Sequence, residues 1–317
     1  MDLSKISKDT RVIITSGCSY SILFSFLYPR LASQNIIVVN LGEGGRSNKW
    51  IANSIIYALE QLKTHPRENL FVVGMCSSVD RQDLIVDKFS NETHLGLDLA
   101  EFADPMFFTD GLSYRQYKWY KQVLDGDNKY DGKRRTGLLS MTNLEKNPDS
   151  QYFLEKFAGM YYKYFYTKLG VFENTLTSMI SLQSYCKLNN IKYTIMTWQD
   201  IFHDTSLQPF FIIGQSYDPI DPKRSHLCKY HKMAKRIDVY PELRYLYDQL
   251  DFSNWWFNNT DRCATGGLAD WCIENGPGLF GSTEDFIHPT IPGYKAFIER
   301  VLAPHVLQKT GWSTQSR

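Results

Sequence analysis

Two short segments near opposite ends of the chain carry residue types that together could perform acyl transfer. Ser19 lies in residues 17–21, GCSYS, directly after an apolar run, and a serine hydroxyl becomes a nucleophile when a neighbouring base takes its proton. Asp285 and His288 lie in residues 285–289, DFIHP. An aspartate three residues before a histidine can, in a turn, hydrogen-bond the imidazole and fix its tautomer. The pattern therefore predicts Ser19 as nucleophile, His288 as base and Asp285 as its orienting acid.

The elements that must position these side chains begin with an alternation of strands and helices. Short apolar, β-branched runs predict strands at 11–15, 36–40, 70–74 and 193–198. Between the first two strands, residues 20–31 can form a helix that Pro29 bends or ends. A second helix is capped near Ser47 or Asn48. This alternation is typical of parallel sheets with right-handed crossovers, and it predicts an α/β, three-layer sandwich around a mostly parallel sheet of four or five strands.

Two further helices are predicted in the second half of the chain. Apolar residues recur at helical spacing across 153–180 and predict one long helix, or two helices with a break near Gly170. A last helix is capped by Thr290, with Pro292 in its first turn. Its position places the DFIHP segment directly before a helix N-terminus.

Two long segments lack a sustained period. Residues 80–150 are polar, and residues 200–284 contain scattered Pro, Gly and Trp. Both predict irregular insertions near the carboxyl ends of the strands. We therefore expect residues 1–317 to form a single α/β domain with these two insertions.

Three segments fall where an open α/β sheet binds its ligands, at the carboxyl ends of strands or just before the last helix. These are residues 17–21, 40–47 and 285–289. The backbone N–H of Ser19, near a predicted helix N-terminus, can face a developing oxyanion. The glycines of 40–47, NLGEGGRS, let a backbone N–H approach a ligand that a side chain would exclude.

Taken together, the three segments resemble the sequence blocks of the SGNH/GDSL hydrolase superfamily. Residues 17–21 resemble its first block, usually Gly-Asp-Ser-x-Ser, residues 40–47 its second, and residues 285–289 match its last, Asp-x-x-His with a following proline. The chain order Ser, Asp, His is also that of α/β hydrolases. The resemblance implies a flavodoxin-like sheet and an esterase that needs no metal or organic cofactor. It assigns the catalytic triad and the oxyanion glycine to Ser19, Asp285, His288 and Gly45.

Two positions depart from the family's blocks. Cys18 stands where the first block usually has Asp. The third block, normally Gly-x-Asn-Asp with an Asn that donates to the oxyanion, is replaced by residues 74–81, GMCSSVDR. Ser77 or Ser78 could donate a hydroxyl and Arg81 could stabilise charge; without any such donor the rate would fall by about a hundred- to a thousandfold. The departure supports an alternative function, a catalytically silent SGNH-fold module that binds glycan or takes part in phage assembly.

Composition and charge limit the expected partners and the expected cellular location. The chain is 43% hydrophobic, and 35 Lys plus Arg balance 34 Asp plus Glu, so no general attraction to nucleic acid or membrane is expected. The N-terminus is polar without a signal sequence, which predicts a cytoplasmic protein. The opening Gly-Cys-Ser-Tyr is similar to a divergent subset often encoded by tailed phages, which implies the host cytoplasm or the virion. The expected partner is a small-molecule or carbohydrate ester, because aromatic-rich insertions suit a sugar platform.

Other residues could also carry chemistry. Cys18 is an alternative thiol nucleophile, although the serine fits the family's register. Asp200 and His203 follow the fourth predicted strand and either line the pocket or cap a loop. Trp255 and Trp256 are either a sugar-stacking platform or part of a core beneath an insertion. A structural zinc, although the spacing matches no standard finger, would draw its ligands from His226, Cys228, His231, Cys263 and Cys272.

Overall fold

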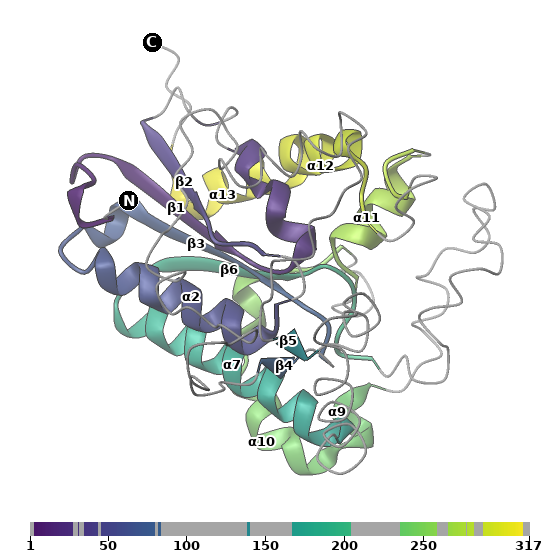
Figure 1. The fold of residues 1–317 in the computed structure, drawn as a ribbon. Coiled ribbons are helices and arrows are strands. Elements are labelled where there is room, and N and C mark those ends of the chain that lie inside the picture. Colours follow the sequence, from purple (N-terminus) through teal and green to yellow (C-terminus); the bar gives the residue numbers. More distant parts are fainter. Residues whose placement is uncertain are drawn as a thin grey trace, which may run out of the picture.

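The main feature of the fold is a parallel five-stranded sheet with helices on both faces (Figure 1). The computed structural model describes residues 3–27, 31, 35–43, 46–79, 82–83, 138–139, 167–203, 235–258, 266–276, 278–281 and 288–312. The strand order is β2-β1-β3-β6-β7, and every neighbouring pair is parallel. The strands of this sheet are β1 Arg11–Ser16, β2 Ile36–Asn40, β3 Leu70–Cys76, β6 Lys192–Thr197 and β7 Trp255–Trp256.

Apolar side chains on both faces explain why the strands are continuous hydrophobic runs. In β1, Val12 and Ile14 pack with the core on one face, Ile13 packs with the core on the other, and all three are fully buried. The first core is covered by α2 Asn48–Gln61 and α7 Lys168–Leu188. The second is covered by η2 Ser19–Phe26, α11 Leu268–Asn275, α12 Ile291–Phe297, the π-helix η9 Ile298–Leu302 and α13 Ala303–Thr310.

Helix caps set the starts of three of these helices. Ser47 Oγ accepts a hydrogen bond from Trp50 N at the start of α2, and Thr290 Oγ1 accepts one from Gly293 N at the start of α12. Thr167 Oγ1 accepts from Gly170 N, so a helix begins at Lys168, close to the break predicted near Gly170, and residues 153–166 of the predicted helical stretch lie outside the described residues. These hydroxyls satisfy N–H groups that have no partner inside the helix.

The predicted strands are confirmed, and two expectations are corrected. The helix expected over 20–31 is the 3₁₀ helix η2, which ends at Phe26. The segment 200–284 is not irregular throughout, since β7 and α11 lie within it. The remaining elements are η1 Leu3–Lys5, η4 Arg67–Asn69, β4 Gln82–Asp83, β5 Leu138–Leu139, α9 Arg236–Val239, η7 Pro241–Leu243, α10 Arg244–Tyr247 and η8 Phe252–Asn254, of which β4 and β5 pair antiparallel.

Among the described residues, no helix combines the length and the apolar character needed to cross a bilayer. The longest, α7, has 21 residues, and buried and exposed positions alternate along it. Its buried side chains pack against α2 and the sheet. This helix is therefore a layer of the sandwich.

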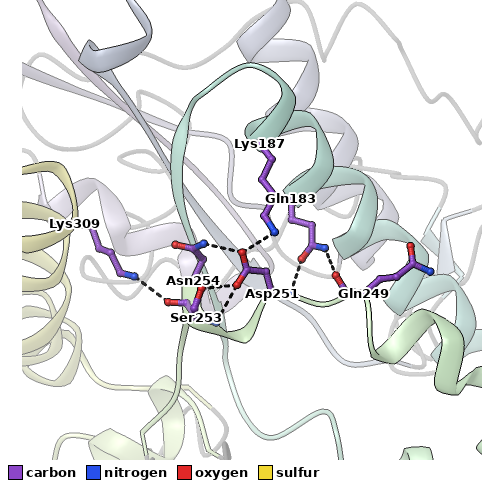
Figure 2. Close-up of polar contacts among 7 residues, drawn as sticks. All are labelled: Gln183, Lys187, Gln249, Asp251, Ser253, Asn254 and Lys309. Atoms are coloured by element: carbon purple, nitrogen blue, oxygen red, sulfur yellow. Dashed lines mark hydrogen bonds and ion pairs between the residues drawn. The ribbon is translucent and has the colours of Figure 1, made fainter.

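A polar cluster joins the end of α7 to the segment before β7 (Figure 2). Asp251 accepts hydrogen bonds from Lys187 Nζ at 2.6 Å and from Asn254 Nδ2 at 3.1 Å, and its carboxylate also accepts from Ser253. The Asp251 N–H donates to Gln183 Oε1 at 3.0 Å. The bond from Lys187, followed by those from Ser253 and Asn254, lowers the pKa of Asp251 to about 2. The cluster holds the chain that leads into the edge strand β7.

We expect Asp251→Ala to lower the free energy of unfolding by about 1–2 kcal/mol at pH 7, because it removes charge-assisted hydrogen bonds. The pKa of Asp251 is lowered in the folded state, so this contribution is present above about pH 4 and is lost as pH falls toward 2. Urea unfolding at pH 7 and at steps below pH 4 measures the difference. The exposed Asp248 supplies the control, and equal pH dependence in Asp248→Ala would contradict the assignment.

Candidate active site

The strand order defines one crevice in the sheet. The chain crosses from β2 over β1 to β3, which is the 2-1-3-4-5 order of flavodoxin-like sheets, and ligands bind at such a switch point at the carboxyl ends of the strands. Ser19 begins η2 three residues after β1 ends, and Ser77 directly follows β3. Ser19 of residues 17–21 and Ser77 of residues 74–81 therefore lie at the switch point.

Ser19 and His288 meet at this edge although 269 residues separate them. The distance from His288 Nε2 to Ser19 Oγ is 2.7 Å, and both residues are half-buried. The backbone around His288 is held on both sides, since its carbonyl accepts from Gly281 N at 2.9 Å and Thr290 N donates to Leu279 O at 3.0 Å. The geometry is that of a hydroxyl whose proton can pass to an imidazole.

Aromatic rings support the imidazole. The ring centroid of Tyr20, which is 3% exposed, lies 4.7 Å from that of His288 and 4.5 Å from that of Trp198. Tyr294 Oη donates to Ser19 O at 3.5 Å, which connects α12 to the start of η2. Tyr20 thus fixes one side of the His288 ring through packing.

Two glycines allow the turn after β1 to pack closely against the loop after β2. A Cβ on Gly17 would lie 2.5 Å from Ser21 Oγ, and one on Gly42 would lie 2.3 Å from the same atom. Ser21 Oγ donates to Cys18 O at 2.8 Å, across the residue that carries the candidate nucleophile. Contact between the two segments therefore requires glycine at positions 17 and 42.

Two asparagines connect the loops, and neither was predicted as a site residue, since Asn48 was considered only as a cap of the second helix. Asn40 Nδ2 donates to Ser21 O at 3.0 Å and to Ile22 O at 2.8 Å, and its Oδ1 accepts from Gly42 N at 2.9 Å. Asn48 Oδ1 accepts from Ser77 N at 2.7 Å. An Asn that ends a buried strand before Leu-Gly is the signal that could have identified Asn40.

The other predicted site residues fall into two groups. Ser77 is fully buried and Ser78 is half-buried, and both lie at the carboxyl end of β3. Three lie outside the described residues: Gly45, Arg81 and Asp285. On either side of the segment 44–45, Glu43 Oε2 accepts from Arg46 Nη2 at 2.7 Å, and Arg46 is 4% exposed.

The cysteines near the site are buried. Cys18 is fully buried, whereas the adjacent Ser19 shares a hydrogen bond with His288 through its Oγ, so the geometry favours oxygen over sulfur as the nucleophile. Cys76 Sγ lies 3.2 Å from Met179 Sδ inside the core, and burial raises the pKa of its thiol far above the usual range. Cys76 is therefore a packing residue.

Asp200 caps a loop. Its Oδ1 accepts from Phe202 N at 2.8 Å and from His203 N at 3.1 Å, and its Oδ2 lies 2.9 Å from His203 Nδ1. Both Asp200 and His203 are buried, which supports the capping interpretation. Trp255 is 6% exposed and belongs to the α2/α7 core, whereas Trp256 is half-buried.

Most of the predicted zinc ligands lie outside the described residues. These are His226, Cys228, His231 and Cys263. Cys272 is described, and it is buried in the second core, where burial raises the pKa of its thiol to about 12. Within the described ranges, no group of three or more His, Cys, Asp or Glu side chains could hold a metal ion.

Comparison of the chain with known proteins identified no similar protein. No family model matches the chain, and no curated protein or solved structure matches it. The Ser19–His288 contact and its place at the switch point are therefore the observations from which a function can be inferred.

Proposed function

We propose that the chain is a serine hydrolase that cleaves carboxylic esters, with Ser19 as nucleophile and His288 as general base. The observation that supports this most strongly is the 2.7 Å hydrogen bond between Ser19 Oγ and His288 Nε2. The bond lies at the carboxyl ends of β1 and β3, where parallel sheets of this order bind ligands. The segments GCSYS and DFIHP, which resemble the first and last blocks of the SGNH/GDSL superfamily, supply these two residues.

In the first step of the reaction, Ser19 Oγ attacks the ester carbonyl carbon while His288 Nε2 takes the hydroxyl proton. The tetrahedral intermediate collapses when the imidazolium returns this proton to the leaving alcohol, which leaves an acyl-enzyme on Ser19. Water, deprotonated by the same imidazole, then attacks the acyl carbon and releases the acid. Asp285 is the residue that the family resemblance assigns to orient the imidazole and stabilise its charged form.

The oxyanion would be held by backbone and hydroxyl donors. The N–H of Ser19, at the start of η2, points from a helix N-terminus, and the resemblance assigns a second N–H to Gly45. Ser78 is half-buried at the end of β3 and offers a hydroxyl where the family has Asn. The sequence also offers Arg81 as a source of positive charge for the oxyanion.

The finer proposal is an SGNH hydrolase fold with insertions at about 80–150 and 200–284. It is supported by the flavodoxin-like strand order and by the three sequence blocks that follow β1, follow β2 and precede α12. The proposed substrate is a small acyl group on a carbohydrate, because the sequences of the two proposed insertions are rich in aromatic residues, which suit a sugar platform.

Labelling with a fluorophosphonate probe tests the proposal, because the probe reacts with serines that a base has activated. We expect wild-type protein to gain one phosphonyl adduct, located at Ser19 by peptide mass spectrometry, and Ser19→Ala to gain none. The matched control is Ser181→Ala, since Ser181 is an exposed serine on α7 whose hydroxyl bonds only to the Thr177 carbonyl in its own helix.

The same experiment separates the alternative function. A folded wild-type protein that takes up no probe would overturn the hydrolase proposal and favour a catalytically silent SGNH-fold module, which the missing third-block Asn supports. Adducts on other serines that persist in Ser19→Ala would also contradict the assignment of Ser19.

A further inference from the structure

A groove lies beside the edge strand β7, and it includes neither Ser19 nor His288. Its volume is about 540 Å³, within the range of about 300–1,000 Å³ that small-molecule sites occupy. It lies between the β7 edge of the sheet and the C-terminal helices η9 and α13. The lining residues are Trp256, Phe257, Asn258, Trp271, Arg300, Val301, Pro304, His305 and Gln308.

Two indoles form the aromatic part of the groove. The rings of Trp256 and Trp271 both pack edge-on against Phe297, with centroid distances of 5.2 Å and 5.4 Å. Phe297 is fully buried, so it holds both rings in place from behind. Trp256 is half-buried, unlike its neighbour Trp255, which is 6% exposed and stacks with Phe257. The groove thus has a preset aromatic surface.

Polar side chains surround this surface. Asn258 Nδ2 donates to Glu274 Oε2 at 2.8 Å, which orients the amide and leaves its oxygen as an acceptor. His305 Nε2 lies 3.0 Å from Thr194 Oγ1, within hydrogen-bond distance. Burial, helped by Lys309, lowers the pKa of His305, so its imidazole is neutral near pH 7 and can both donate and accept.

The helix that borders the groove has an irregular turn at the residues that line the groove. Residues Ile298–Leu302 form the π-helix η9, which interrupts the helical run between α12 and α13. Arg300 and Val301 lie in this turn, and Arg300 is exposed. A π-turn widens the helix and changes the direction of its side chains, and such turns often occur at functional sites.

We propose that this groove binds a carbohydrate whose pyranose rings carry equatorial hydroxyls. Such a ring has C–H groups on its two faces and hydroxyls around its edge. The C–H face stacks on Trp256, because the face of an indole is electron-rich. The ring hydroxyls hydrogen-bond to Asn258, Arg300 and Gln308, all of which line the groove. An apolar ligand would make no use of these polar groups, which favours a carbohydrate over a lipid.

Isothermal titration with cellotetraose, a neutral oligosaccharide of such rings, tests the proposal. We expect saturable binding to the wild-type protein, weakened at least about tenfold by Trp256→Ala, which removes the stacking surface. Because Trp256 also packs on Phe297, the exposed Arg300→Ala is a second variant, and it is expected to weaken binding without loss of fold. Sorbitol, which has hydroxyls but no ring face, is expected not to compete.

The matched control is Arg244→Ala, because Arg244 is also an exposed arginine near an aromatic ring but lies outside the groove. It is expected to bind cellotetraose as the wild type does. Absence of saturable binding, or equal weakening by Arg244→Ala and Arg300→Ala, would overturn the proposal. Ser19→Ala is expected to bind normally, so failure of the hydrolase proposal and failure of this one give different results. Loss of binding in Ser19→Ala would place the sugar at the other site and overturn the groove assignment.

Discussion

Replacing His288 with glutamine is expected to lower kcat/KM for p-nitrophenyl acetate by at least about a thousandfold, because the variant keeps a hydrogen bond to Ser19 but loses the base. Glutamine is close to histidine in size, and its amide can still contact Ser19 Oγ, which lies 2.7 Å from His288 Nε2. An amide does not take up a proton near neutral pH. The serine then stays an ordinary alcohol, and steady-state kinetics at pH 7–8 measure the loss.

The control for this variant is His65→Gln. His65 is 5% exposed, and its Nε2 lies 2.8 Å from Thr10 O, near the amino end of β1 and far along the strand from Ser19. Glutamine can keep that contact, so the rate is expected to match wild type. If His288→Gln hydrolysed the ester as fast as His65→Gln, the Ser19–His288 bond would be structural only.

The sheet was predictable because its strands are buried on both faces. The run of Val12, Ile13 and Ile14 identifies β1 without knowledge of its partners, since every position is apolar and β-branched. The caps Ser47 and Thr290 were identifiable for a similar reason, because a side chain that bonds to the backbone two or three residues later leaves a local signal.

Elements that depend on distant contacts were not predictable. Strand β7 has only two residues, Trp255 and Trp256, and it exists because Ile195 and Met196 of β6 pair with them. No period can be read in two residues. The helix α11 is likewise fixed by a distant partner, because Ala269 N donates to Trp198 O at the end of β6.

In the candidate site too, residues with a local sequence signal were predictable and residues that depend on distant contacts were not. Ser19 and His288 could be found because each lies in a short segment whose spacing has chemical meaning. Tyr20 and Asn48 could not, because their roles arise from contacts with His288 and Ser77 that only the folded chain creates. Reactive residues are therefore easier to identify from the sequence than the residues that hold them in place.

A buried aspartate, Asp270, makes the stability of the packing behind the site depend on pH. Asp270 in α11 is 2% exposed, and its Oδ2 accepts from Gly267 N at 2.7 Å at the start of the helix. Burial, with the nearby charges of Asp200 and Glu274, raises the pKa of Asp270 to about 8. A Cβ on Gly267 would lie 2.2 Å from Thr197 O, so the helix start is packed directly on the end of β6.

We expect Asp270→Asn to remove a decline in stability between about pH 4 and pH 8. In this window the unfolded chain, whose Asp has its ordinary pKa of 3.8, releases a proton that the folded protein retains. Stability therefore falls as pH rises, by up to about 1.4 kcal/mol per pH unit from this group, and the fall ends above the folded pKa. Asparagine carries no charge and keeps an oxygen for Gly267 N, so the variant lacks this slope.

Urea unfolding at pH 5, 6.5 and 8 measures the effect. The variant is expected to gain stability relative to wild type at each step toward pH 8, whereas the exposed Asp238→Asn is expected to keep the wild-type slope. Parallel slopes for wild type and Asp270→Asn would show that Asp270 is already ionised at pH 5. Because α11 holds Trp198, and Trp198 packs on Tyr20 beside His288, the variant is also expected to keep its hydrolase activity to higher pH than wild type.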